Sequence, residues 1–190
     1  MGNLRDNPGA LLCVVGARPN YMLPPYCAHT QLFRTRVPGG GNPDEIRRWM
    51  AMMGPAFNDM HHYCWGLMKS NRALYLARDK QTRDFYLGLA VQEFDYVLQR
   101  APADFALRPE ILTKKGEHLL KLGNAPAAVA ALEEAAELKP DYWPPYAALS
   151  DHFKSAGALP RAKEWLDRGL KAAPDSRALR TRLEQLEKQR

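Results

Sequence analysis

The sequence has no long hydrophobic run. None of its apolar stretches approaches the roughly 18 residues that a transmembrane helix needs, and the longest candidate is "ALLCVVGA" at residues 10–17. The preceding "MGNLRDNPG" lacks the charged segment that opens a signal peptide. Leu12 stands where a lipoprotein signal has a small residue, and Asp6 where a myristoylation signal has Ser or Thr. The sequence predicts no membrane span, and it leaves the localisation open between the cytoplasm and the bacterial periplasm.

Cysteine is scarce, with three residues in a chain of 190. A chain of this length buries most of its apolar surface without a metal or a disulfide. The C-x-x-C-H motif of a c-type haem is missing, as is the paired Cys/His spacing of a structural zinc site. No oxyanion-hole glycine motif accompanies the cysteines and histidines. We therefore expect a protein that is not an enzyme and has no cofactor.

Runs of basic residues with interleaved aromatics are also lacking, which gives no clear indication of a nucleic-acid partner. The net charge is +6, with 46% hydrophobic and 25% charged residues, as in ordinary folded domains. Residues 161–190 contain nine Lys/Arg against five Asp/Glu, whereas residues 109–150 contain four against six. The basic excess therefore lies toward the C-terminus, and the middle of the chain is mildly acidic.

An internal repeat is present in the second half of the chain. Pro140 in "LKPDY" and Pro174 in "AAPDS" lie 34 residues apart, which is the tetratricopeptide period. The positions before each proline carry small and large apolar residues at matching spacings: Gly116, Ala128, Leu132 and Ala135 before Pro140, and Ser150, Ala162, Leu166 and Gly169 before Pro174. Residues 59–190 thus resemble the tetratricopeptide repeat superfamily.

Turn signals separate the predicted helices. Gly123 suits the end of one helix, Asn124 can cap the next and Pro126 suits its first turn. Gly157 and Pro160 have the same roles one repeat later. These signals and the repeat frame predict helices at 57–78, 82–100, 108–122, 125–138, 143–156, 159–172 and 176–189. The predicted fold is all-α: a tetratricopeptide-type α-solenoid of about three helix pairs plus a C-terminal capping helix.

We expect two parts in the chain. Residues 1–55 are rich in Pro and Gly and read as an extended N-terminal arm with a short helix at 43–53, and residues 56–190 form the helical repeat domain. The repeat that ends at Pro102 is irregular, because its small first-helix residue, Gly66, lies 24 positions before Ala90 instead of 12. We interpret it as a lengthened helix pair.

The segment "DMHHYCWGLMKSNRA" at residues 59–73 is crowded with aromatic, sulfur and imidazole side chains. On a helix, Met60, Tyr63, Cys64, Leu67, Met68, Leu74 and Tyr75 form one broad apolar face, which the arm is expected to cover with Met22, Leu23, Tyr26 and Phe33. Cys64 is then a buried thiol, or a partner of Cys27 in a disulfide, or a ligand with Cys27, Met60 and His61 in a copper or zinc site.

The resemblance implies a function in protein binding, as an adaptor or scaffold. In tetratricopeptide proteins the first helices of successive pairs line a concave groove that receives a peptide or a partner's helix. The family's groove positions fall here on Glu110, Thr113, Glu117, Leu120 and Lys121, and then on Pro144, Ala147, Asp151, Lys154 and Ser155. Thr113, Glu117, Ala147 and Asp151 stand where the chaperone-binding subfamily has Lys and Asn, which disfavours that subfamily.

These residues place carboxylates at the centre of the predicted groove and lysines at its edge. A basic or mixed peptide or helix of another protein is the partner we expect, and a second copy of the chain is an alternative cover for the apolar surface. The same residues could instead form an ordinary solvated helix face. A metal-handling protein, using Cys27, Cys64 and the neighbouring Met and His, is the alternative function.

Overall fold

A computed structural model describes residues 23–188 of the 190-residue chain. Within this range the chain is helical and contains no strand. The elements are η1 (Pro25–His29), α2 (Pro43–Met53), η2 (Gly54–Asp59), α3 (Met60–Asn71), η3 (Arg72–Leu76), α4 (Lys80–Arg100), α5 (Arg108–Lys121), α6 (Ala125–Leu138), α7 (Pro144–Ser155), α8 (Leu159–Ala172) and α9 (Arg177–Glu187). The predicted all-α class is confirmed.

The predicted helix boundaries agree best where local signals are strong. Helices α6 and α8 have the predicted bounds, 125–138 and 159–172. The Asn124 side chain accepts a hydrogen bond from the backbone N–H of Ala127 at 3.4 Å. Gly123 and Gly157 have φ angles of 81° and 75°, in the left-handed region that glycine adopts without strain. These turns end one helix and begin the next, as the sequence predicts.

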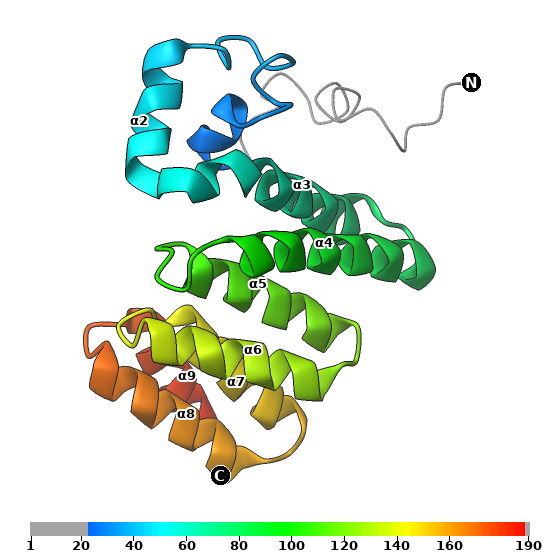
Figure 1. Cartoon of the computed structure of the whole chain (residues 1–190). Helices are drawn as coiled ribbons and strands as arrows, with labels where there is room; N and C mark the ends of the chain where they lie inside the picture. The colour runs from blue at the N-terminus through cyan, green and yellow to red at the C-terminus, as the bar shows by residue number, and fades with distance from the viewer. Residues whose placement is uncertain (1–22, 189–190) are drawn as a thin grey trace. The chain divides into compact units, whose positions relative to one another are not determined.

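The chain divides into two compact units, Met1–Phe105 and Ala106–Arg190, of which the first is described from residue 23 onward. In the first unit, α3 and α4 form an antiparallel pair (Figure 1). Helix α4 buries a stripe of Leu87, Ala90, Phe94 and Val97 at helical spacing. Phe94 packs on Tyr63 of α3 with ring centroids 5.5 Å apart.

The predicted helix 57–78 differs from the observed structure at both ends. It begins as the 3₁₀ turn η2 and ends as the π-helical turn η3. Leu74 and Tyr75, predicted on the buried face, are 46% and 67% exposed. That part of the prediction is wrong, because η3 lies at the turn between α3 and α4, where the facing helix begins only at Lys80.

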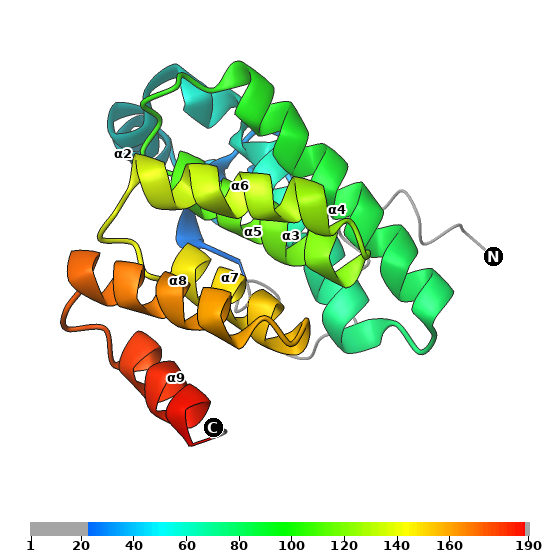
Figure 2. The same cartoon turned by 90° about the horizontal axis from the view of Figure 1, so that it is seen from below.

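The second unit contains the pairs α5–α6 and α7–α8, followed by α9 (Figures 1 and 2). Leu132, Leu149, Leu166 and Leu179 are fully buried in its core, one from each of α6 to α9. Gly116 lets α5 approach α6, because a Cβ on this residue would lie 2.6 Å from Cγ of Leu132. The helices are therefore packed around small residues, as in helical repeats.

Two glycines of the α3–α4 pair provide a matched test of this packing. A Cβ at Gly66 would lie 2.7 Å from Cδ1 of Phe94, whereas a Cβ at Gly88 would meet nothing within 4 Å. Gly66→Ala should lower the free energy of unfolding by about 1 to 3 kcal/mol through overpacking. Gly88→Ala should be neutral or stabilise by up to about 1 kcal/mol, since alanine favours the helix. Urea unfolding measures both, and equal effects would contradict the observed packing.

Candidate functional site

The predicted groove residues of the second unit lie on α5 and α7, but not all of them are accessible. Thr113 and Ala147 are buried, with 1% and 3% of their surface exposed. The Thr113 hydroxyl donates to the carbonyl of Pro109 in its own helix at 2.7 Å. Neither side chain presents a polar group at the surface, so the accessible chemistry of this region comes from their neighbours.

Glu110 and Glu117 of α5 form an acidic pair near Tyr142. Both glutamates are partly buried, and Glu117 accepts a hydrogen bond from Lys114 Nζ at 3.2 Å. Burial raises the pKa of Tyr142 to about 12, and the negative charges of Glu110 and Glu117 contribute to the shift. Tyr142 therefore keeps its hydroxyl proton beside two carboxylates. The sequence prediction did not include this tyrosine, which lies in the connection between α6 and α7.

Asp151 of α7 is bound by a guanidinium from the C-terminal helix. Nε of Arg182 in α9 donates to both carboxylate oxygens of Asp151, at 3.1 and 3.2 Å. Both side chains remain accessible, at 33% for Arg182 and 53% for Asp151. An arginine of the same chain thus already occupies one predicted binding carboxylate.

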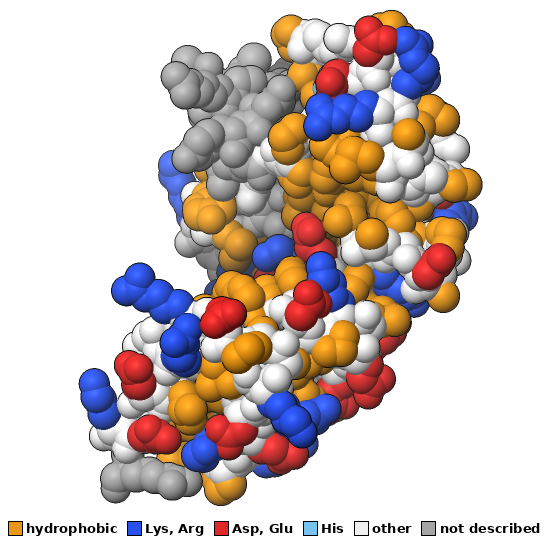
Figure 3. Space-filling view, turned by 90° about the vertical axis from the view of Figure 1, so that its left-hand side faces the viewer, with side chains coloured by type: hydrophobic (Ala, Val, Ile, Leu, Met, Phe, Trp, Pro, Cys, Tyr) orange, Lys and Arg blue, Asp and Glu red, His pale blue; other side chains and the backbone are white. Residues whose placement is uncertain are grey.

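The other predicted groove residues vary in exposure. Leu120 is partly buried and packs on the core of the second unit. Lys121 and Ser155 are exposed, and Lys154 and Pro144 are partly buried. The face seen in Figure 3 likewise carries acidic and basic side chains side by side on the second unit. The accessible groups along α5 and α7 are therefore of both charges.

His118 of α5 is a buried histidine that the sequence prediction missed. It is 3% exposed, and burial lowers the pKa of its imidazole to about 4, with Lys121 and then Lys114 adding to the shift. Its position seven residues after Ile111, which is fully buried, was the available signal, since such residues share a helix face. The imidazole is neutral at pH 7.

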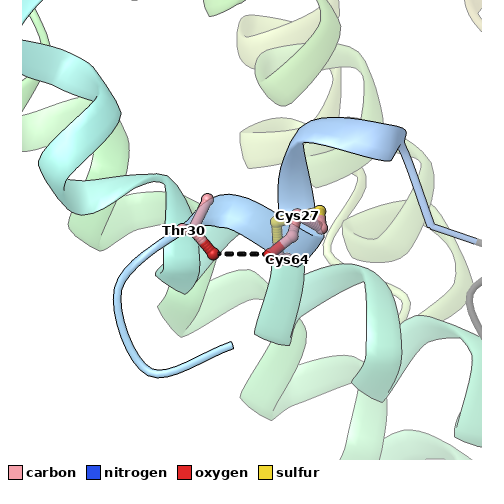
Figure 4. The surroundings of a disulfide bond; sticks show 3 residues. All are labelled: Cys27, Thr30 and Cys64. Atoms are coloured by element: carbon pink, nitrogen blue, oxygen red, sulfur yellow. Dashed lines mark hydrogen bonds between the residues drawn. A yellow bond between two sulfur atoms is a disulfide. The ribbon is translucent and has the colours of Figure 1, made fainter. Parts of the chain in front are cut away.

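The first unit contains a disulfide between Cys27 of η1 and Cys64 of α3 (Figure 4). The S–S distance is 2.01 Å, and the two Cα atoms lie 5.7 Å apart. The hydroxyl group of Thr30 donates a hydrogen bond to the carbonyl oxygen of Cys27 at 2.8 Å. Both cysteines are buried, at 1% and 0% exposure, which makes this a structural bond rather than an accessible redox pair.

Of the four arm residues that were predicted to cover α3, the structure describes three. Tyr26 and Phe33 are buried, at 7% and 6% exposure, and η1 contacts α3. Leu23 is partly buried, and Met22 lies outside the described residues. Cys27 of the arm is bonded to Cys64, so this part of the arm is joined to the helix both by contact and by a covalent bond.

The alternative metal site at Cys27, Met60, His61 and Cys64 has no support in the structure. The disulfide removes both thiolates as ligands. Nδ1 of His61 lies 3.0 Å from the carbonyl of Asn58, and burial, followed by the neighbouring His62, lowers the pKa of His61. Over residues 23–188, no cluster of three or more His, Cys, Asp or Glu side chains is arranged to hold a metal ion.

Antiparallel helix pairs stacked around small residues define a class, the α-helical repeat proteins. Within that class, residues 119–186 match the family model of the tetratricopeptide repeat. The resemblance to the tetratricopeptide repeat seen at Pro140 and Pro174 is therefore confirmed over this segment. A search of the curated proteins found no match.

Proposed function

We propose that the protein is a scaffold that binds a basic or mixed peptide or helix of another protein along α5 and α7. Tetratricopeptide repeats generally act in protein–protein interaction and are generally not enzymes, and the match at residues 119–186 supports that role here. No helix within residues 23–188 has the length and apolarity to cross a membrane. The partner's chemistry is inferred from the charged side chains of this surface.

The observation that carries the proposal is the pair between Asp151 and Arg182. A guanidinium held by a carboxylate on α7 is the contact that an arginine of a bound peptide would make. Glu110 and Glu117 on α5 provide two further carboxylates beside Tyr142. Tyr142 adds a partly buried ring, and aromatic side chains are common anchors in protein interfaces. An Arg- or Lys-containing segment with flanking apolar residues fits these groups.

Glutamate-to-glutamine changes on α5 test the acidic character of the surface. The probes are two labelled synthetic peptides, one of leucine and arginine and one with glutamate replacing every arginine. The full chain should bind the basic peptide at least about tenfold more tightly in fluorescence anisotropy. Glu110→Gln/Glu117→Gln should slow the association of the basic peptide several-fold and weaken its salt dependence, because exposed charges act mainly on the association rate.

The control is Glu133→Gln/Glu137→Gln on α6, which makes the same charge change on a second helix. This variant should bind like the unchanged protein. A second variant, Arg182→Gln, should tighten binding of the basic peptide, since it frees Asp151 from its internal partner. Equal binding by all four proteins would contradict the proposal that the peptide binds along α5 and α7.

A further inference from the structure

The turn between α3 and α4 carries a cluster of exposed apolar side chains, which we call the apolar tip. Its members share high exposure for their size and lie within 12 residues of sequence: Leu74 at 46%, Tyr75 at 67%, Leu76 at 44% and Phe85 at 53%. The first three belong to η3 and the last to the first turns of α4. Figure 1 shows this turn at one end of the α3–α4 pair.

The apolar tip is exposed on more than one side. Leu74, Tyr75 and Leu76 are consecutive residues of a helical turn, so their side chains point in different directions and cannot all lie on one flat face. Phe85 adds a fourth apolar side chain from the opposing helix and packs edge-on against Tyr86. A flat protein surface would cover one side of such a projection only. An apolar medium that surrounds the projection would cover every side.

Basic residues lie close to the apolar tip in the sequence. Residues 72–86 contain four cations, Arg72, Arg78, Lys80 and Arg83, against the carboxylates Asp79 and Asp84. Asp84 is engaged by Lys80 and Arg83, and Asp79 accepts a hydrogen bond from the N–H of Thr82 as the cap of α4. Arg72 lies over the ring of Tyr86 at 5.6 Å, and Arg78 and Lys80 are exposed. The segment that carries the tip therefore combines leucine and aromatic side chains with a net positive charge.

We propose that the apolar tip docks the protein on the surface of an anionic phospholipid bilayer. Leu, Phe and Tyr side chains enter the boundary between headgroups and acyl chains, while Lys and Arg beside them remain at the level of the anionic headgroups. The bilayer surrounds the tip on all sides, as its shape requires. The proposal concerns residues of the first unit and does not depend on peptide binding by α5 and α7.

Co-sedimentation with vesicles tests the proposal on the full, oxidised chain. The unchanged protein should sediment with vesicles of phosphatidylglycerol and phosphatidylcholine, and less with phosphatidylcholine alone or at high salt. Leu74→Ser/Tyr75→Ser/Leu76→Ser/Phe85→Ser should lower the partition coefficient by roughly tenfold or more. Met50→Ser/Met52→Ser makes similar changes at exposed positions of α2 and should leave sedimentation unchanged. Arg78→Glu/Lys80→Glu should remove the preference for anionic vesicles.

A fluorescence measurement remains informative if the fourfold variant is unstable. Tyr75→Trp should show a blue-shifted emission with anionic vesicles and quenching by brominated lipids, whereas Leu138→Trp, an exposed position of α6, should show neither. Absence of sedimentation by the unchanged protein, or unchanged sedimentation by a folded fourfold variant, would overturn the proposal. So would a concentration-dependent dimer that the fourfold variant abolishes, in a protein that ignores vesicles, because the tip would then bind a second copy of the chain.

Discussion

Replacing Cys27 and Cys64 together by alanine should lower the free energy of unfolding by about 4 kcal/mol. The bond joins residues that are 37 positions apart, and opening a loop of that length returns conformational freedom to the unfolded chain. Urea unfolding of the oxidised protein and of the double variant measures the difference. Because both sulfurs are buried, a reductant should act slowly on the folded protein and quickly in urea.

Cys13→Ala is the control for this experiment, since it also removes one cysteine but leaves the bonded pair intact. It should unfold like the unchanged protein. The double variant should also be insensitive to reductant, whereas the unchanged protein should lose stability when its bond is reduced. If the unchanged protein had the same urea midpoint with and without reductant, the bond would not contribute to stability. Such bonds persist in oxidising compartments, so preparations from a reducing cytosol should show the lower stability.

The second large effect is a loss of stability in mild acid that depends on His118. Folding lowers the pKa of this imidazole from 6.5 to about 4, chiefly by burial. Between these two values the unfolded chain binds a proton at His118 that the folded chain does not. The free energy of unfolding is therefore not reduced by this residue above the unfolded pKa, and it declines as the pH falls below that value. Between about pH 7 and about pH 4.5 the expected loss is approximately 2 to 3 kcal/mol.

The measurement compares urea unfolding of the unchanged protein and of His118→Leu and His118→Gln at the two pH values. Other groups titrate in the same range, so the informative quantity is the difference between proteins in the loss of stability. Both variants should lose about 2 to 3 kcal/mol less than the unchanged protein on acidification. Two side chains of different polarity are used because either can alter the packing at a position that is 3% exposed. Equal losses in all three proteins would mean that His118 is accessible to protons in the folded state.

The sequence predicted the second half of the fold well because the signals there are local. Gly123, Asn124 and Pro126 act within one turn of the chain, and the observed bounds of α6 follow them to the residue. The 34-residue spacing of Pro140 and Pro174 then sets the frame for the neighbouring helices. Propensity, turn chemistry and the repeat pattern all agree in this region, which is the condition under which sequence reasoning succeeds.

The first half of the fold and the details of the site depend on contacts distant in sequence. The apolar pattern continues through Leu74 and Tyr75, but whether it is buried depends on where the facing helix begins. The burial of Thr113 and the pairing of Asp151 with Arg182 depend on the placement of other helices. The choice among a thiol, a disulfide and a metal ligand at Cys64 likewise required knowing how far Cys27 lies from it.

The short helix α2 lies inside the covalent loop that Cys27 and Cys64 close. None of its residues is fully buried, and Met50 and Met52 are exposed, but Trp49 packs edge-on against Tyr26 of η1 with ring centroids 5.6 Å apart. The disulfide joins the two ends of the loop that contains the helix. Local opening of α2 therefore cannot carry the segment far from the fold, because the closed loop limits its excursion.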